Sequence, residues 1–197
     1  MKKLVFMASG SGTNFENLVK AIRAGQITAE AALLVCDKPG AGCLERAKRL
    51  GVPTEIVDRK AFDSKAAFEE RIGELLDGVP ADWIILAGFM RVLSAEFVTR
   101  YWGRIINIHP SLLPKFPGAS AIRDAFEAKV SETGVTTHFV TPEVDAGPII
   151  LQKKVPVTPS DNLDTLEARV HAAEYEIYPE TLRLLLSGKV KPPAPLI

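Results

Sequence analysis

An amide, an imidazole and a carboxylate are the side chains in this sequence whose types could perform acid–base chemistry together. Asn107 and His109 stand two residues apart at the start of the run Asn107–Pro114, and Asp145 lies in the segment Val144–Pro148. Residues two apart on a strand point to the same face of a sheet, so we expect the amide and the imidazole side by side. Such a pair can donate hydrogen bonds to a reacting oxygen or transfer a proton.

Each of these residues also has an ordinary structural interpretation. A single histidine such as His109 is often structural, and Asp145 could simply be an aspartate that stabilises a turn. His138 falls inside a predicted strand and is interpreted as a satisfied sheet or core histidine. The position of Asn107 and His109 at a strand end favours function, because ligands of open α/β sheets bind beyond the carboxyl ends of the strands.

A glycine-rich segment, Ser9–Glu16, follows the first predicted strand. Glycines permit a sharp turn, and the free N–H groups at the next helix start attract an anion. A dinucleotide fingerprint is excluded because Phe15 occupies its third glycine position, and no Gly-Lys-Ser/Thr of a P-loop follows. The turn therefore favours a single phosphate monoester, with a ligand-free glycine turn as the alternative. The spacing of Thr13 and Glu16 predicts a capping box.

Length and composition limit the class of protein. With 47% hydrophobic residues in a chain of 197, we expect a single domain over residues 1–190 and a proline-rich tail at 191–197. The 24 basic and 24 acidic residues balance, which gives no general attraction to nucleic acid or membranes. Cys36 and Cys43 lack metal or redox spacing, so reduced thiols in a cytosolic protein are expected. The apolar start is too short for a signal peptide or a membrane span.

Apolar runs alternate with helical patterns along the first part of the chain. We expect strands near 4–8, 31–36, 53–57, 83–87 and 105–108, and helices near 14–24, 44–50, 67–75 and 94–101. This alternation predicts an α/β fold with a mostly parallel sheet and right-handed helical crossovers.

The pattern changes after residue 109. Residues 110–118 are rich in proline and glycine and read as a loop, and strands near 135–140 and 149–157 predict an antiparallel C-terminal extension of the sheet. A last helix begins near residue 163, with Pro179 either kinking it or starting a second segment. We expect the tail to be extended or frayed.

Most of the chain resembles the family of folate-dependent formyltransferases that act on 5'-phosphoribosylglycinamide. The most specific matches are the glycine-rich turn, Ala87–Leu93, Asn107–Pro114, Lys115–Gly118 and Val144–Pro148. The resemblance implies a Rossmann-like sheet with a folate site near its middle. It also implies formyl transfer from 10-formyltetrahydrofolate to the substrate amine in de novo purine (IMP) biosynthesis, without a metal.

The resemblance assigns roles to the candidate residues. Asn107, His109 and Asp145 stand where the catalytic trio of the family stands. The residues that match its ribonucleotide site, including the phosphate turn, are Gly12, Thr13, Asn14, His171 and Glu174. Those that match its folate site are Lys65, Met90, Arg91, Val92, Leu93, Asn107, Thr141, Pro142, Glu143 and Val144.

The sequence departs from the family at two places. Lys65 stands where an arginine is common, and this change keeps the positive charge but loses the bidentate fork of the guanidinium. Histidines that some relatives carry after Gly118 are missing here.

The implied reaction is direct attack of the amine on the formyl carbon through a tetrahedral intermediate. Asn107 and a protonated His109 would donate to the formyl oxygen, each preorganised donor typically contributing about 3–4 kcal/mol. Asp145 would hold His109 in its working charge state and help to move the proton from the amine to the leaving nitrogen.

Related functions on the same fold remain as alternatives. Methionyl-tRNA formyltransferase carries an additional C-terminal domain, and formyltetrahydrofolate hydrolase an additional N-terminal one; we expect neither here. A non-catalytic nucleotide-binding module would have no reason to keep Asn107, His109 and Asp145 together. We therefore expect a cytoplasmic monomer or homodimer that binds small molecules, not nucleic acid or membranes.

Overall fold

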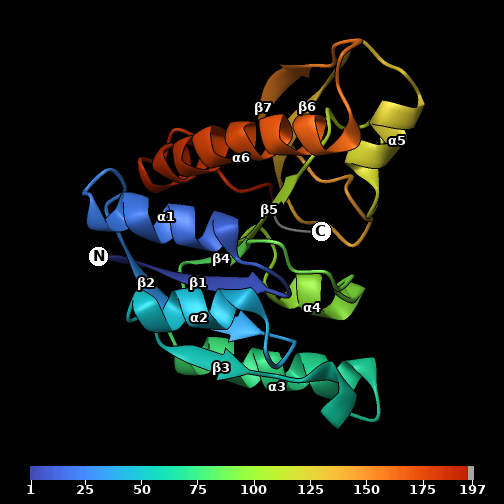
Figure 1. Ribbon diagram of the computed structural model, residues 1–197. Helices are drawn as coiled ribbons and strands as arrows, with labels where there is room; N and C mark the ends of the chain where they lie inside the picture. The colour runs from blue at the N-terminus through green and yellow to red at the C-terminus, as the bar shows by residue number, and fades with distance from the viewer. Residues whose placement is uncertain (195–197) are drawn as a thin grey trace.

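The computed structural model describes residues 1–194, and within them seven strands form one sheet in the order β3-β2-β1-β4-β5-β6-β7 (Figure 1). The strands are β1 (Lys2–Ala8), β2 (Ala29–Cys36), β3 (Thr54–Ile56), β4 (Trp83–Leu86), β5 (Ile105–His109), β6 (Glu132–Phe139) and β7 (Ile149–Pro156). The first five pair in parallel, whereas β6 and β7 are antiparallel. The predicted α/β fold with an antiparallel extension is confirmed.

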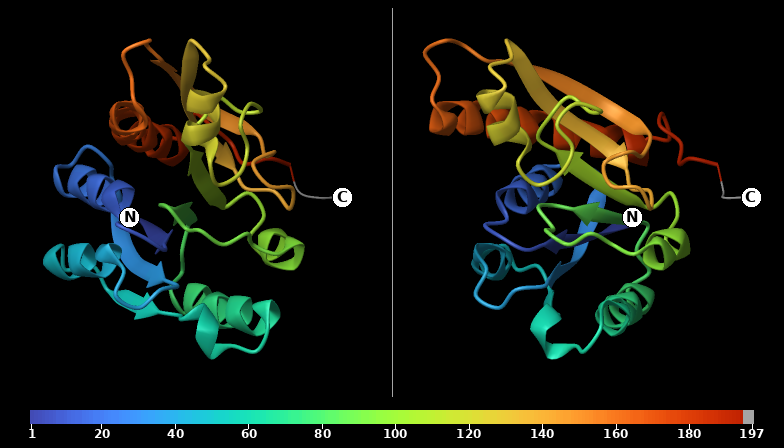
Figure 2. Two further views of the ribbon diagram at one scale, coloured as in Figure 1. Left: turned by 45° about the vertical axis from the view of Figure 1, so that its right-hand side comes forward. Right: turned by 90° about the vertical axis from the view of Figure 1, so that its right-hand side faces the viewer.

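Helices cover both faces of the sheet (Figure 2). They are α1 (Thr13–Arg23), α2 (Gly42–Arg49), α3 (Lys65–Gly78), α4 (Ala95–Arg100), α5 (Ala121–Glu127) and α6 (Leu163–Leu186), with a short 3-10 helix at Arg59–Ala61. Helices α1, α2 and α6 pack on one face, and α3 and α4 pack on the other. The alternation of residues in β1 explains this double burial, since Leu4 and Phe6 point into the first core while Val5 and Met7 point into the second.

The start of α1 differs from the predicted capping box. The helix begins at Thr13 after Gly12, which adopts a left-handed conformation, and no side chain caps it. Glu16 instead pairs with Arg46 and Arg49 of α2. The prediction was wrong because these ion pairs compete for the carboxylate that a capping box would need.

Pro179 does not start a second segment, because the structure describes a single helix over Leu163–Leu186 that contains it. A proline cannot donate to the carbonyl four residues before it, which here belongs to Tyr175. The side-chain amide of Asn17 on α1 donates to that carbonyl instead, at 2.9 Å. A tertiary contact thus replaces the missing helical hydrogen bond.

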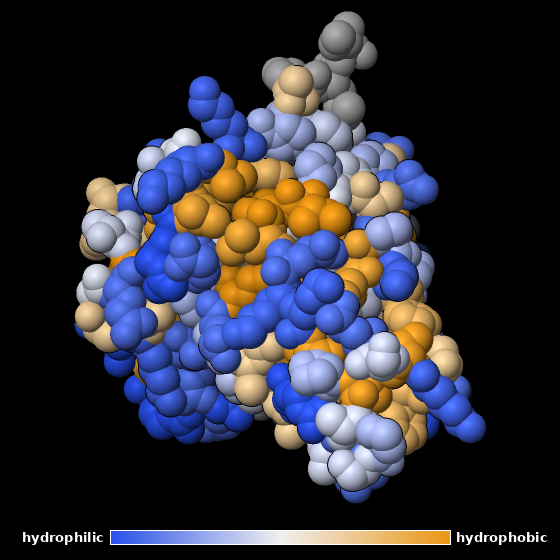
Figure 3. Space-filling model, turned by 90° about the horizontal axis from the view of Figure 1, so that it is seen from above, coloured by the Kyte–Doolittle hydropathy of each residue, from blue (hydrophilic) through white to orange (hydrophobic). Residues whose placement is uncertain are grey.

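The described part of the tail packs on the protein. Nε1 of Trp102 donates to the carbonyl of Ala194 at 2.7 Å, and Pro192 lies against Gly103. The rest of the predicted tail, residues 195–197, lies outside the described residues. The side of the molecule that carries β6, β7 and α6 shows an apolar area bordered by hydrophilic side chains (Figure 3). Every helix among residues 1–194 is too short or too polar to cross a membrane.

Candidate active site

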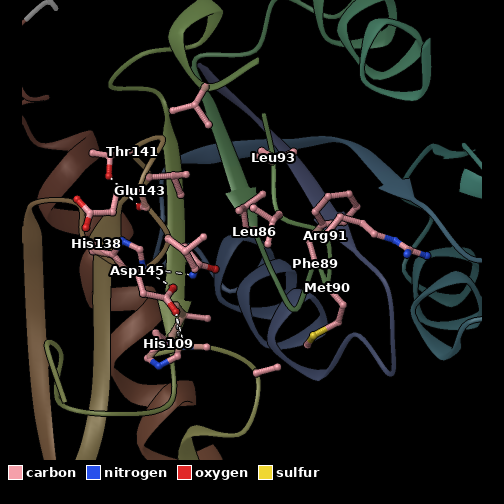
Figure 4. Close-up of a pocket in the computed structure, with 18 of the residues that line it drawn as sticks. Leu86, Phe89, Met90, Arg91, Leu93, His109, His138, Thr141, Glu143 and Asp145 are labelled. Carbon is pink, nitrogen blue, oxygen red and sulfur yellow. Dashed lines mark hydrogen bonds and ion pairs between the residues drawn. The ribbon is translucent and has the colours of Figure 1, made fainter. Parts of the chain in front are cut away.

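A cavity of about 260 Å³ opens at the carboxyl ends of β4 and β5 (Figure 4). Its walls come from the segment after β4, the end of β5 with the loop that follows, and the turn between β6 and β7. The lining residues are Leu86, Gly88, Phe89, Met90, Arg91, Val92, Leu93, Val98, Asn107, Ile108, His109, Pro110, Gly118, Ala119, His138, Val140, Thr141, Pro142, Glu143, Val144 and Asp145. The three candidate catalytic residues therefore share one cavity at the predicted edge of the sheet.

The ring of His109 lies between two hydrogen-bond acceptors. Its Nδ1 is 3.5 Å from Oδ2 of Asp145, and its Nε2 is 2.8 Å from the carbonyl oxygen of Phe116. Both acceptors are satisfied together only when both ring nitrogens carry a proton. The carboxylate of Asp145 is therefore placed to form an ion pair with Nδ1 of His109 when the ring carries a proton.

Asp145 is held in place by its own turn. It has a positive φ of 54°, and its Oδ2 accepts the N–H of Gly118 at 2.8 Å. Gly147, two residues later, lies so close to the backbone of Phe139 that an added Cβ would meet the carbonyl oxygen at 1.8 Å. The tight return of the chain from β6 to β7 thus aims the carboxylate at His109.

His138 takes part in the site although the sequence favoured a structural role for it. Its Nδ1–H donates to the carbonyl of Phe139 at 2.9 Å, which leaves Nε2 to accept from the amide of Asn107 at 3.2 Å. Burial lowers the pKa of His138, so the neutral ring is favoured despite the carboxylate of Asp145 3.8 Å away. The residue is buried and satisfied, as predicted, but its partner is a candidate catalytic residue.

The predicted folate-binding residues divide into two groups. Met90–Leu93 and Thr141–Val144 line the cavity, and Met90 stands at its rim with 72% of its surface exposed. The guanidinium of Arg91 extends away from His109 (Figure 4) and pairs with buried Asp37 at 2.6 Å. Lys65 is not among the lining residues.

Lys65 begins α3 and borders a separate hollow formed by α3 and α4. Its Nζ lies 3.8 Å from the buried carboxylate of Glu69. A solvated charge at a helix start and a contact with an extended ligand tail are both compatible with this position.

The predicted ribonucleotide residues come together from the two ends of the chain. The amide nitrogen of Asn14 donates to Oε2 of Glu174 at 2.9 Å, and Nδ1 of His171 lies 2.9 Å from the same oxygen. This hydrogen bond raises the pKa of His171. The carboxylate of Glu174 takes one N–H of the Asn14 amide, and the main-chain N–H groups of Ser11 and Gly12 have no partner within residues 1–194 and are free to meet a phosphate.

Comparisons with known proteins point to one family. The formyl transferase family matches residues 2–182. A phosphoribosylglycinamide formyltransferase of Bacillus subtilis is 45% identical over 94% of this chain and 95% of its own. The crystal structure of glycinamide ribonucleotide transformylase 1 from Symbiobacterium toebii, 42% identical, has a TM-score of 0.95 and covers 99% of this chain and 92% of that one. That of the Geobacillus kaustophilus protein of the same name, 51% identical, has a TM-score of 0.92 over 94% of this chain and 99% of that one. The chain therefore belongs to the formyl transferase family.

Proposed function

We propose that this enzyme transfers the formyl group of 10-formyltetrahydrofolate to the amine of 5'-phosphoribosylglycinamide in purine biosynthesis. The observation that carries the proposal is one cavity in which an amide, an imidazole and a carboxylate face an apolar hollow beside a glycine-rich turn. The names of the relatives point to the same reaction.

The apolar part of the cavity suits the flat ring of a folate. Leu86, Val140 and the exposed side chains of Met90 and Val92 supply apolar walls, and Asn107 supplies a polar end. Ligand pockets of this kind combine mostly apolar walls with a few placed polar groups. These walls support a formyl-folate as the donor, and we infer that its reactive end lies toward His109.

The glycine-rich turn lies next to this cavity, because Ser9 at its start contacts the segment after β4. The N–H of Ser9 donates to the carbonyl of Gly88 at 3.0 Å, and the N–H of Met90 donates to Oγ of Ser9 at 2.8 Å. The end of β1, which leads into the phosphate turn, is thereby joined to the segment that lines the folate cavity. A phosphorylated amine bound at the turn could reach a formyl group held in the cavity.

Each side chain that faces the cavity has its own role in formyl transfer. His138 occupies one N–H of the Asn107 amide, so the second N–H is free to donate to the formyl oxygen as it gains negative charge. Protonated His109 donates to the same oxygen once its Nε2–H leaves the carbonyl of Phe116. Asp145 stays at Nδ1, orients the ring and helps to move the proton from the attacking amine to the leaving nitrogen, directly or through water.

A coupled assay tests the proposal. The enzyme is incubated with 10-formyltetrahydrofolate, with and without 5'-phosphoribosylglycinamide, and both deformylated folate and formylated ribonucleotide are measured. We expect folate turnover only with the ribonucleotide, in equal amounts of the two products. Turnover with water alone would indicate the hydrolase alternative, and formylation of methionyl-tRNA would indicate the tRNA-directed alternative.

The domain organisation, the location in the cell and the assembly state are proposed from the sequence. We propose that residues 1–190 act as a single formyltransferase domain in the cytoplasm, as a monomer or a homodimer. Sedimentation velocity distinguishes the two assembly states, and limited proteolysis would reveal a second cooperative unit if one existed.

A further inference from the structure

The start of α2 supports the glycine-rich turn from behind. The N–H of Cys43 donates to the carbonyl of Gly10 at 3.0 Å, and Nε of Arg46 donates to the carbonyl of Ser11 at 2.8 Å. Gly12, with a φ of +75°, packs so closely on α2 that an added Cβ would lie 2.4 Å from the Cβ of Cys43. The helix therefore holds two successive carbonyl groups of the turn on its own side.

The direction of each carbonyl fixes the direction of the N–H group in the same peptide unit. In a trans peptide the carbonyl of one residue and the N–H of the next point in opposite directions. Because α2 holds the carbonyls of Gly10 and Ser11, the N–H groups of Ser11 and Gly12 point away from α2. Within residues 1–194 neither N–H donates to another group. Free N–H groups at such a turn are suited to bind an anion.

Arg46 is itself held by a carboxylate of α1. Its guanidinium bridges the Ser11 carbonyl and the carboxylate of Glu16, which also binds Arg49 at 2.7 Å and Lys20 at 3.0 Å. Within residues 1–194, Arg46 is the one of these three cations that also donates a hydrogen bond to the turn. A cationic donor on a carbonyl polarises the peptide and strengthens its N–H as a donor.

We propose that Arg46 is a positioning residue for recognition of the substrate phosphate, because it holds the Ser11 carbonyl back so that the Gly12 N–H faces the anion. The inference rests on the proposed function, which places the 5'-phosphate of the ribonucleotide at this turn. Arg46 acts through the backbone of the turn, so its loss affects phosphate binding and leaves the chemistry in the cavity unchanged.

Three variants test this role. Arg46→Met keeps much of the aliphatic stem and removes every donor. Arg46→Lys keeps the charge but lacks the planar fork that bridges Ser11 and Glu16. Arg49→Met is the matched control, because it removes a cation from the same helix and the same carboxylate without touching the turn.

We expect the KM to change for one of the two substrates only. Arg46→Met should raise the KM for 5'-phosphoribosylglycinamide about tenfold, the loss expected for a charged hydrogen bond partly replaced by water. Arg46→Lys should restore part of this loss, and Arg49→Met should stay within about twofold of wild type. The kcat and the KM for 10-formyltetrahydrofolate should not change in Arg46→Met. A similar rise in both KM values, or an equal effect of Arg49→Met, would overturn the inference.

A substrate without its phosphate gives a second comparison. Against the ribonucleoside that lacks the 5'-phosphate, Arg46→Met and wild type should have the same kcat/KM. A purely structural defect would lower kcat/KM for the ribonucleoside as much as for the ribonucleotide, and that outcome would contradict the proposal.

Inorganic phosphate separates this inference from the proposed function. In an NMR titration of wild type with phosphate, the amide signals of Ser11 and Gly12 should shift, and Arg46→Met should need about tenfold more phosphate for the same shift. Wild type that binds phosphate in this way but does not formylate the ribonucleotide would refute the proposed function and leave the role of Arg46 intact. Unmoved amide signals in wild type, or equal affinities in the two proteins, would refute the role of Arg46.

Discussion

Nε2 of His138 lies 3.2 Å from the amide nitrogen of Asn107, and the two residues are direct partners in the pairing of β5 with β6. Because Nδ1–H of His138 donates to the carbonyl of Phe139, Nε2 carries the lone pair that accepts from Asn107. Burial lowers the pKa of His138, which keeps this acceptor available at neutral pH. The amide of Asn107 is thereby fixed in one orientation, with its second N–H free.

Replacing His138 by leucine should lower kcat about 10- to 100-fold, because the Asn107 amide loses the partner that orients it toward the developing charge. Both KM values should change by less than about threefold, since that charge exists only along the reaction path. His138→Gln offers an acceptor of similar reach and should recover part of the loss. Steady-state kinetics decide the matter, and a leucine variant with normal turnover would show that Asn107 needs no support from His138.

Replacing Asp145 by asparagine should lower turnover by at least about 10²-fold. The ring of His109 lies between the carboxylate of Asp145 and the carbonyl of Phe116, and a neutral amide cannot form the ion pair that the carboxylate offers to a protonated ring. The N–H of Gly118 can still be accepted by the amide oxygen, so the turn should keep its shape. The measurement is kcat and KM for both substrates, with thermal unfolding as a control. Near-normal turnover would reduce Asp145 to a turn residue.

The His171–Glu174 pair should make stability depend on pH. The hydrogen bond with Glu174 raises the pKa of His171 above its value in the unfolded chain. The stability that the pair contributes is therefore complete below the unfolded pKa of about 6.5 and is lost as pH rises through the pKa of the folded protein. His171→Gln removes the titrating group. The difference in melting temperature between wild type and His171→Gln should therefore shrink from pH 6 toward alkaline pH. A difference that stays constant across that range would show that the pair does not stabilise the fold.

The architecture was predictable where each element depends on its own residues. The continuous apolar run Trp83–Leu86 has to be a strand buried on both faces, and Ser94 does accept the N–H of Phe97 as the cap of α4. Helix α5 was missed because it is only seven residues long, although Ala121 and Ala125 are buried and Ile122 and Phe126 pack against the core. The start of α1 was misread because a tertiary partner, not the local spacing, decides what Glu16 binds.

The candidate site was predictable along one strand but not between strands. Alternation along β5 is enough to place Asn107 and His109 in the same cavity. The contact of His138 with Asn107 depends on the register between β5 and β6, and a shift of one residue would turn His138 to the other face. The pairing of Arg91 with Asp37 likewise depends on how two loops approach one another.

The contact between Asn17 and the carbonyl of Tyr175 gives a test of how α6 tolerates Pro179. Asn17→Ala leaves that carbonyl without a protein donor, because Pro179 has no N–H to supply one. The free energy of unfolding should fall by about 1–2 kcal/mol, measured with urea.

A double-mutant cycle identifies the cause of that loss. In Pro179→Ala the alanine N–H can donate to the carbonyl of Tyr175, so adding Asn17→Ala should then cost less than about half of what it costs in wild type. Pro179 is itself buried, and the cycle subtracts whatever packing the alanine loses on its own. Equal costs of Asn17→Ala in the two backgrounds would mean that Asn17 stabilises the α1–α6 contact by packing and does not replace the helical hydrogen bond.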